Sequence, residues 1–362
     1  MTEQKYIYEL SLEDLTEALK AAGEPAFRAK QIHDWIYHKF ASSWDDMTNL
    51  PKNLRRICAG LWKFNSVSVV DSAKSEDGTE KLLLRLHDNE CIEMVIIPSQ
   101  KRTTFCLSTQ VGCPVGCLFC ASGRNGLIRN LAMHEIIGSF QAGCSKIKSL
   151  PDNIVFMGIG EGLLNFENLV NAVDRLTSPQ YFGMGVRRIT ISTSGFVPGI
   201  YKLAELNREL NLAISLHAPD DQIRQRIIPS KIRYPIAEIM EAADYYREKC
   251  NRMVTLEYTL LQGINDSVDC ARNLAGIARK HHAKVNLIPY NETDSDFKRP
   301  SRKIISNFYN TLLNADTAVS IRQERGSDKA GACGQLRLLS FEVKESKTKK
   351  AVLPAAQENN IQ

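Results

Sequence analysis

Cys113-Pro-Val-Gly-Cys117-Leu-Phe-Cys120 places three cysteines in a CxxxCxxC spacing within this 362-residue chain. Iron–sulfur clusters are held by cysteine thiolates, and a four-iron cluster bound by only three of them keeps one iron open. An open iron can bind a small molecule through an amine and a carboxylate. The spacing therefore predicts a cluster that takes part in chemistry and does more than pass electrons.

The composition is that of an ordinary globular protein, with 43% hydrophobic residues and a formal net charge of +5. No apolar run approaches the roughly 20 residues needed to cross a bilayer, and the first residues lack the apolar core of a signal peptide. Four of the ten cysteines lie between Cys106 and Cys120, which favours metal chemistry in a reducing compartment over a disulfide framework. We expect a cytoplasmic protein with no membrane association.

Residues 1–98 are predicted to form an accessory domain of helices plus a small antiparallel sheet. Ser11 begins a capping box for the first helix, a second helix runs from about residue 25 to 39, and a third follows Pro51. Apolar and polar residues then alternate through residues 67–96, with turns at Asp77-Gly78 and Asp88-Asn89.

Residues 99–343 alternate short apolar strands with helix-length amphipathic segments, which is the pattern of parallel βα units. The expected strands are 104–107, 153–157, 188–192, 211–216, 254–260 and 284–287. Six such units favour an α/β fold with an open, partial barrel. In this architecture the chemistry lies at the carboxyl ends of the strands. Residues 344–362 are rich in lysine and polar residues, and we expect them to be a disordered tail.

The three-cysteine spacing resembles the signature of the radical S-adenosylmethionine (radical SAM) superfamily, in which an aromatic residue such as Phe119 precedes the last cysteine. This resemblance implies a partial (β/α)6 barrel, one 4Fe-4S cluster held by Cys113, Cys117 and Cys120, and S-adenosylmethionine (SAM) as cofactor. Zinc is the alternative metal. A structural zinc site usually has four ligands in two separated pairs, and the nearest further cysteine upstream is Cys106.

Two further cysteines narrow the resemblance. Cys106 precedes the cluster loop, and Cys333 lies in Arg325-Gly-Ser-Asp-Lys-Ala-Gly-Ala-Cys333-Gly-Gln-Leu336. With them, residues 5–342 resemble the RlmN/Cfr family of radical SAM methyltransferases, which methylate an adenosine ring carbon in RNA. The alternative for both is a buried small hydrophobic side chain, which we expect for the remaining five cysteines.

The resemblance implies a catalytic scheme that uses two SAM molecules per turnover. Cys333 takes a methyl group from the first SAM, and a radical derived from the second removes a hydrogen from that methyl group. The carbon radical adds to the adenine, leaving RNA and protein joined by a thioether. Cys106 then releases the RNA by forming a disulfide with Cys333, while a base removes the ring proton. The base implied by the resemblance is Glu93, for which an exposed strand carboxylate is the alternative interpretation.

The SAM site is also implied by the resemblance. Gly160-Glu161 resembles the glycine-glutamate motif that receives the amino group of the methionine part of SAM. The strand-end residues that in the family contact ribose, carboxylate and adenine match Ser192, Ser215, Leu216, His217 and Asn291. Taken singly, a serine after a strand is more often a helix cap, and a lone histidine is more often structural.

The implied partner is a structured RNA, either 23S rRNA alone or tRNA as well, with flavodoxin or ferredoxin as electron donor. Lys52, Arg55 and Arg56 on the third predicted helix, with Trp35, Tyr37 and Trp62 nearby, suit phosphate contact and base stacking. A place in the core is the alternative for these aromatic residues.

The target carbon stays open at this point. Gly162 follows Glu161 where the family usually has proline, and Ser327 follows Gly326 where many C2 methyltransferases have aspartate. We favour adenosine C2 and hold adenosine C8, which would confer antibiotic resistance, as the alternative. A radical SAM enzyme acting on a non-RNA substrate is a further alternative, which would have no need of Cys106 and Cys333. A zinc-stabilised RNA-binding module is the non-enzymatic one.

Overall fold

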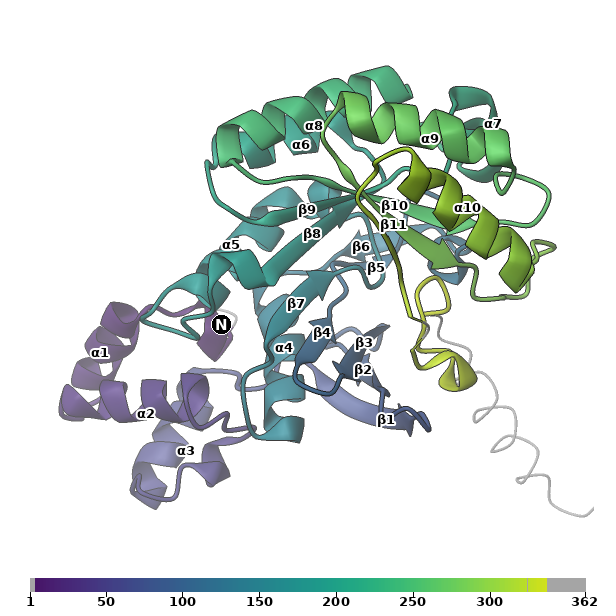
Figure 1. Cartoon of the computed structure of the whole chain (residues 1–362). Coiled ribbons are helices and arrows are strands. Elements are labelled where there is room, and N and C mark those ends of the chain that lie inside the picture. The colour runs from purple at the N-terminus through teal and green to yellow at the C-terminus, as the bar shows by residue number, and fades with distance from the viewer. Residues whose placement is uncertain (1–3, 324, 337–362) are drawn as a thin grey trace, which may run out of the picture.

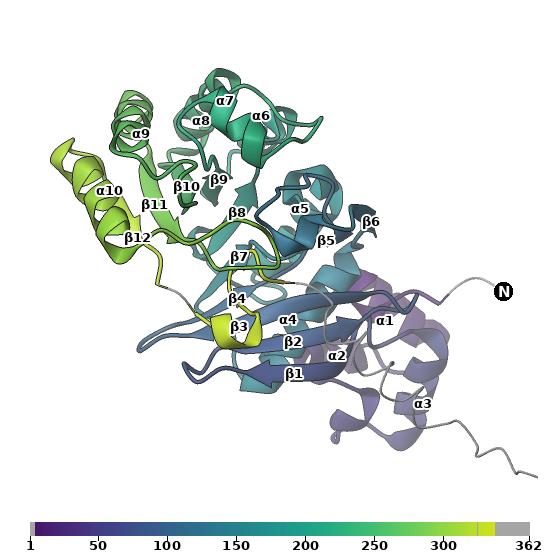
Figure 2. The ribbon, with the colours of Figure 1, turned by 90° about the vertical axis from the view of Figure 1, so that its right-hand side faces the viewer.

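The structure is a computed structural model that describes residues 4–323 and 325–336. The strands are β1 (Ser68–Lys74), β2 (Glu80–Arg85), β3 (Cys91–Pro98), β4 (Thr103–Cys106), β5 (Gln110–Gly112), β6 (Leu127–Asn130), β7 (Asn153–Phe156), β8 (Ile189–Thr193), β9 (Asn211–Ser215), β10 (Thr255–Leu260), β11 (Lys284–Pro289) and β12 (Val319–Ile321). Ten of them form one sheet in the order β1-β2-β3-β4-β7-β8-β9-β10-β11-β12, and β5 pairs with β6 alone. The edge strands β1 and β12 do not pair with each other, so the curved sheet stays open (Figure 1, Figure 2).

The six predicted barrel strands are confirmed as β4, β7, β8, β9, β10 and β11, each within two residues of its expected bounds and all parallel to one another. The partial α/β barrel is therefore confirmed. A seventh parallel strand, β12, pairs with β11 and was not predicted. It has three residues, of which Ser320 and Ile321 are exposed, so no alternating pattern marks it in the sequence.

Helices follow the strands and cover the outer face of the barrel (Figure 1). They are α4 (Met133–Ile147), α5 (Phe166–Thr177), α6 (Val197–Glu205), α7 (Asp221–Ile227), α8 (Ile236–Cys250), α9 (Val268–Lys280) and α10 (Arg302–Asn314). Short 3-10 turns are η1 (Ile7–Glu9), η2 (Trp44–Asp46), η3 (Ala121–Gly123), η4 (Gly162–Asn165), η5 (Val186–Arg188) and η6 (Ser327–Lys329). No helix within the described residues is both long and apolar enough to span a bilayer.

The three predicted N-terminal helices are confirmed as α1 (Leu12–Ala21), α2 (Phe27–Tyr37) and α3 (Lys52–Leu61). Ser11 caps α1 as expected, because its hydroxyl accepts from the Asp14 amide at 3.0 Å and the Asp14 carboxylate accepts from the Ser11 amide at 2.9 Å. The helical unit lies against α4, where the Gln141 side chain donates to the carbonyls of Ile36 and Ala41. Its apolar residues share one core with the barrel.

The predicted antiparallel strands β1, β2 and β3 are present, but they do not form a small sheet of their own. β3 pairs antiparallel with β4, with Val95 opposite Cys106, so the three strands extend the sheet of the barrel (Figure 2). The expected boundary at residue 98 thus falls between two hydrogen-bonded strands. Periodicity reveals a strand but not its partner, which explains the difference. The predicted disordered tail, residues 344–362, lies outside the described residues.

Candidate active site

The three cysteines of the CxxxCxxC stretch line one pocket of about 930 Å³ at the carboxyl ends of the barrel strands. Their loop is closed at its base by the β5–β6 pair, where the Cys113 amide donates to the Gly126 carbonyl at 2.9 Å. A Cβ at Gly112 would lie 2.0 Å from that same carbonyl oxygen, so only glycine permits the two strands to approach this closely. The hairpin therefore holds the three thiols at one wall of the pocket.

The strand-end residues predicted to bind SAM converge on the same pocket, which is lined by Gly160, Glu161, Ser192, Ser215, His217 and Asn291. Gly160 has a φ of +117°, and a Cβ there would lie 2.7 Å from the Thr109 hydroxyl. A glycine is thus required at this turn for steric and conformational reasons. The barrel brings together residues from β7, β8, β9 and β11 because parallel strands present their carboxyl ends at one edge.

Glu161 is buried at the edge of this pocket. Its carboxylate accepts from the amide of Ser194 at 2.6 Å and from the amide of Leu163 at 3.2 Å. Burial raises the pKa of Glu161, and the hydrogen bonds from Ser194 oppose that rise. Each carboxylate oxygen keeps capacity for another donor, so Glu161 can accept from an ammonium group in the pocket.

His217 is held in one tautomer. Its Nδ1 accepts from the Thr259 amide at 3.0 Å, so in the neutral ring the proton lies on Nε2. Burial lowers the pKa of His217 to about 3, which keeps the ring neutral near pH 7. Its edge-to-face contact with Phe119, at 5.0 Å between ring centroids, couples it to the cluster loop.

Asn291 joins this pocket to the segment that contains Cys333. Its side-chain amide donates to the Cys333 carbonyl at 3.1 Å, whereas its Oδ1 atom is buried and has no hydrogen-bond partner. A buried acceptor without a donor is costly, so Oδ1 fits an N–H group of a ligand such as an adenine amino group.

Leu216 differs from the expectation. Its side chain is fully buried in the hydrophobic core and does not line the pocket. β9 ends at Ser215, and the backbone of His217 is left-handed with a φ of +59°. Ser215 and His217 line the pocket, whereas Leu216 between them packs into the core. Only its backbone can serve the site, and its carbonyl already accepts from Arg224 Nε at 3.2 Å.

The pocket also contains residues that were not predicted, among them Glu257 and Arg322. Glu257 is buried on β10, where burial raises its pKa and Asn286 donates to its carboxylate at 2.8 Å. A lone carboxylate within the apolar strand Thr255–Leu260 was a usable signal. Arg322 directly follows β12, and nothing in its local sequence marks it.

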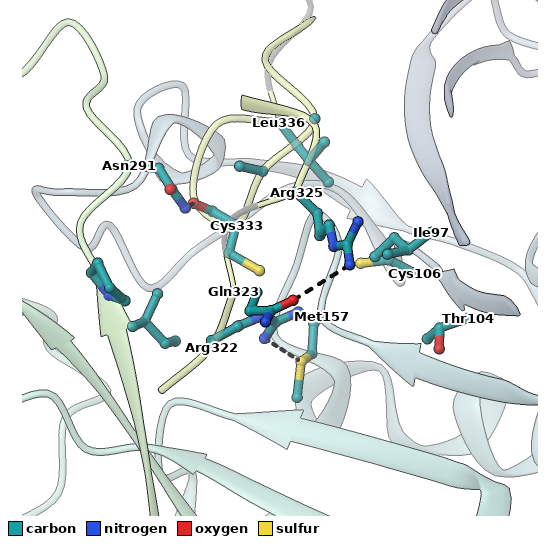
Figure 3. A pocket seen from close by; sticks show the side chains of 14 residues that line it. Ile97, Thr104, Cys106, Met157, Asn291, Arg322, Gln323, Arg325, Cys333 and Leu336 are labelled. Atoms are coloured by element: carbon teal, nitrogen blue, oxygen red, sulfur yellow. Dashed lines mark hydrogen bonds between the residues drawn. The ribbon is translucent and has the colours of Figure 1, made fainter. Parts of the chain in front are cut away.

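Cys106 and Cys333 line an adjoining pocket of about 850 Å³. Figure 3 shows their sulfur atoms entering this pocket from opposite sides, Cys106 from β4 and Cys333 from the loop after β12. Cys333 also lines the pocket of the three cluster cysteines, as does Arg322. The Arg322 guanidinium donates to the Met157 sulfur at 3.5 Å, and the negative charge of a Cys333 thiolate contributes most to the raised pKa of Arg322. Burial raises the pKa of the Cys106 thiol to about 12.

The loop that contains Cys333 is anchored at several points. The Ser75 hydroxyl bonds to Asp328, and the Gly326 amide donates to Asp77 at 3.2 Å, both from the β1–β2 hairpin. On the cluster side, the Ser122 hydroxyl donates to the Leu336 carbonyl at 2.9 Å. The antiparallel strands and the cluster loop together therefore position Cys333.

Glu93 is fully buried, so its interpretation as an exposed strand carboxylate is wrong. Its Oε1 atom pairs with Lys81 Nζ at 2.7 Å. Glu93 lies two residues before Val95, which faces Cys106 across the strands, so Glu93 and Cys106 share one face of the sheet. Glu93 is not among the described residues that line the two pockets.

The N-terminal aromatic residues divide between core and surface. Tyr37 and Trp62 are buried in the core, whereas Trp35 is half-buried and Lys39 lies over its ring at 4.6 Å. Lys52 and Arg56 are exposed on α3. The basic residues therefore remain available to a phosphate backbone, and two of the three aromatic residues do not.

The three cluster thiols fit an iron–sulfur cluster better than zinc. Within residues 4–323 and 325–336, no group of three His, Cys, Asp or Glu side chains converges to hold a single metal ion. In a four-iron cluster each thiolate binds a different iron, so the thiolates need not meet at one point. Burial raises the pKa of the Cys113, Cys117 and Cys120 thiols, and a bound metal would replace their protons.

Comparisons with known proteins agree with this geometry. The family described as "Ribosomal RNA large subunit methyltransferase N-terminal domain" matches residues 6–59, and "Radical SAM superfamily" matches residues 107–271. "Probable dual-specificity RNA methyltransferase RlmN 3" of Opitutus terrae is 44% identical, covering 91% of this chain and 93% of that protein. "Probable dual-specificity RNA methyltransferase RlmN" of Akkermansia muciniphila is 41% identical, covering 93% and 96%.

A solved structure shows the same fold. The crystal structure of a radical SAM methyltransferase from Sphaerobacter thermophilus superposes with a TM-score of 0.87 at 41% sequence identity, covering 92% of this chain and 99% of that one. The chain therefore belongs to the RlmN family of radical SAM RNA methyltransferases, whose cofactors are a 4Fe-4S cluster and SAM.

Proposed function

We propose that this enzyme methylates C2 of an adenosine in 23S rRNA, with tRNA as a second substrate, by way of a methyl group on Cys333. The observation that supports the proposal most strongly is that Cys333 lines both pockets, one shared with the cluster cysteines and one shared with Cys106. A carbon acquired on the cofactor side could thus be passed to a base on the other side without a large movement of the chain.

The chain's own residues divide the work. When bound, the cluster and SAM supply the methyl group and the radical that activates it. Cys113, Cys117 and Cys120 would hold the cluster. The residues proposed to orient SAM are Gly160, Glu161, Ser192, Ser215, His217 and Asn291, all of which line the cluster pocket. The Glu161 carboxylate would accept a hydrogen bond from the amino group of the methionine part of SAM, and Asn291 Oδ1 would accept one from the adenine of SAM.

Cys106 is proposed to release the product. Its thiolate sulfur bonds to the Cys333 sulfur while the carbon–sulfur bond to the RNA breaks. The electron pair of that bond goes to the carbon, which takes up a proton and becomes the methyl group, and the two cysteines end as a disulfide. Only a thiolate can attack, and burial favours the neutral thiol at this position. The Arg322 guanidinium lowers the pKa of Cys106 against that effect.

Glu93 is proposed as the acceptor of the ring proton. Its ion pair with Lys81 favours the carboxylate form that a base requires, and it lies on the sheet face of Cys106. Since Glu93 lines neither pocket as described, the target adenosine would have to enter beyond Cys106, extruded from its stack.

The proposed division of the chain is by role. Residues 1–98 would form an accessory domain that grips RNA through α1 to α3 and also supplies Glu93 from β3, and residues 99–343 the catalytic barrel. Lys52 and Arg56 on α3 are exposed and suit phosphate contacts. A flavodoxin or ferredoxin is proposed as the electron donor.

The test is the Cys106→Ala variant, with Cys270→Ala on α9 as the matched control. Cys106→Ala should accumulate a covalent RNA–protein adduct, seen as a gel shift that survives denaturant, whereas Cys270→Ala should turn over normally. Clean turnover by Cys106→Ala would remove Cys106 from the reaction. Digestion of the modified RNA to nucleosides then identifies the carbon, since 8-methyladenosine in place of 2-methyladenosine would contradict the C2 assignment.

A further inference from the structure

Arg224 is a fully buried cation next to the cluster loop. It lies on α7 with none of its surface exposed. Its guanidinium donates to three backbone carbonyls, those of Leu216 and Tyr234 at 3.2 Å each and that of Ser194. In the part of the chain that the structure describes, no carboxylate forms an ion pair with it. Three carbonyls accept hydrogen bonds from it but carry no formal negative charge, and burying a cation without a paired anion is costly.

The packing of α7 places this charge beside the cluster cysteines. The Leu118 amide, next to Cys117, donates to the Ile227 carbonyl at the end of α7 at 3.0 Å. Ile223 and Ile227 pack in the same small apolar cluster as the three cysteines. Apolar side chains thus exclude water between the helix and the cluster loop, so a charge on one acts strongly on the other.

Two acidic groups act on Arg224 most strongly, the Cys117 thiol and then Asp221. The Asp221 carboxylate instead accepts from the Ile236 amide at 3.0 Å. Burial lowers the pKa of Arg224 to about 10, and the Cys117 thiolate is the main opposing influence. The counter-charge that the buried guanidinium lacks would therefore come from the cluster site.

We propose that Arg224 raises the reduction potential of the cluster held by Cys113, Cys117 and Cys120. Reduction adds one negative charge to the cluster, and a nearby buried positive charge stabilises the reduced form more than the oxidised form. Net charge and hydrogen bonding are established determinants of cluster potentials. Arg224 lines neither of the two pockets, so it would act on the cluster through its charge and not by contact with SAM or RNA. The inference rests on the proposed cluster site.

The test is a redox titration of the cluster-loaded enzyme without SAM or RNA, followed by electron paramagnetic resonance. Arg224→Met should lower the ratio of reduced to oxidised cluster at a fixed potential about tenfold, which is about 59 mV for a one-electron couple. Arg224→Lys, which keeps the charge and loses most hydrogen bonds, should recover most of this shift. Arg226→Met removes an exposed charge from the same helix, so it should shift the ratio less than about twofold.

Each outcome bears on the inference. An unshifted potential in Arg224→Met with an intact cluster would overturn it, as would equal shifts in Arg224→Met and Arg224→Lys, because the cause would then be lost positioning and not lost charge. Should Arg224→Met not fold, Arg224→Gln keeps donors for the carbonyls and takes its place against Arg224→Lys. A wild-type protein that assembles no four-iron cluster would instead refute the proposed function.

Discussion

The buried ion pair between Lys81 and Glu93 gives the sharpest stability prediction. Lys81 Nζ lies 2.7 Å from Glu93 Oε1, the Glu93 side chain is fully buried, and the Lys81 side chain is 11% exposed. Lys81→Met keeps most of the aliphatic volume and leaves a buried carboxylate without this counter-charge. Breaking a buried pair from one side costs about 3–5 kcal/mol, so we expect the free energy of unfolding to fall by that amount.

A double-mutant cycle isolates the pair. Lys81→Met, Glu93→Gln and the double variant are compared by urea unfolding followed by circular dichroism. The two single variants each lose free energy of unfolding, and the double variant should lose about 2–3 kcal/mol less than the sum of these two losses. The reason is that the double variant removes both charges together. Arg187→Met breaks the exposed pair with Glu209 and is the control, with a far smaller loss.

The same variants test the chemistry. Lys81→Met and Glu93→Gln should still acquire a methyl group on Cys333, because that step precedes proton removal, but should release the RNA adduct slowly. If the stability losses of the two single variants add up to the loss of the double variant within about 0.5 kcal/mol, the two residues are not coupled and the reasoning fails. Wild-type release by Glu93→Gln would remove Glu93 from the reaction.

Two further predictions concern packing and pH. In Gly143→Ala the new Cβ would lie 2.5 Å from Phe105 and 2.7 Å from Met94, so this variant should lose about 1–3 kcal/mol of stability. In Gly60→Ala the new Cβ would have no atom within 4 Å, so this variant should gain up to about 1 kcal/mol of stability. Equal changes of the melting temperature in the two variants would refute the packing argument. The pKa of His217 is lowered to about 3 from 6.5 by burial, so the native state binds fewer protons than the unfolded state between these values. Its contribution to stability should be complete above pH 6.5 and fall by about 1.4 kcal/mol per pH unit on acidification, a slope that His217→Asn should reduce.

Much of the fold was predictable because its signals are local. The strands of the barrel are short apolar runs. Polar residues and glycines such as Gly160-Glu161 and Ser215 lie at their carboxyl ends, where they line the pocket. The three cluster cysteines lie within eight residues, so their joint role is visible in the spacing alone. The strand β12 and the pairing of β3 with β4 were not predictable. A three-residue strand is too short to show an alternating pattern, and the sequence of a strand does not indicate which other strand it pairs with.

The chain alone thus settles which residues can do iron–sulfur and thiol chemistry, since residue type and short spacing are properties of the covalent chain. The tertiary structure determines which of these residues lie close together. Cys106 and Cys333 share a pocket only because the segment after β12 returns across β4, and Glu93 is buried only because β3 joins the barrel sheet. Leu216 packs into the core between two residues that line the pocket, and Arg224 acquires its place beside the cluster loop from the packing of α7. Distances between residues far apart in sequence arise from packing, and no local pattern encodes them.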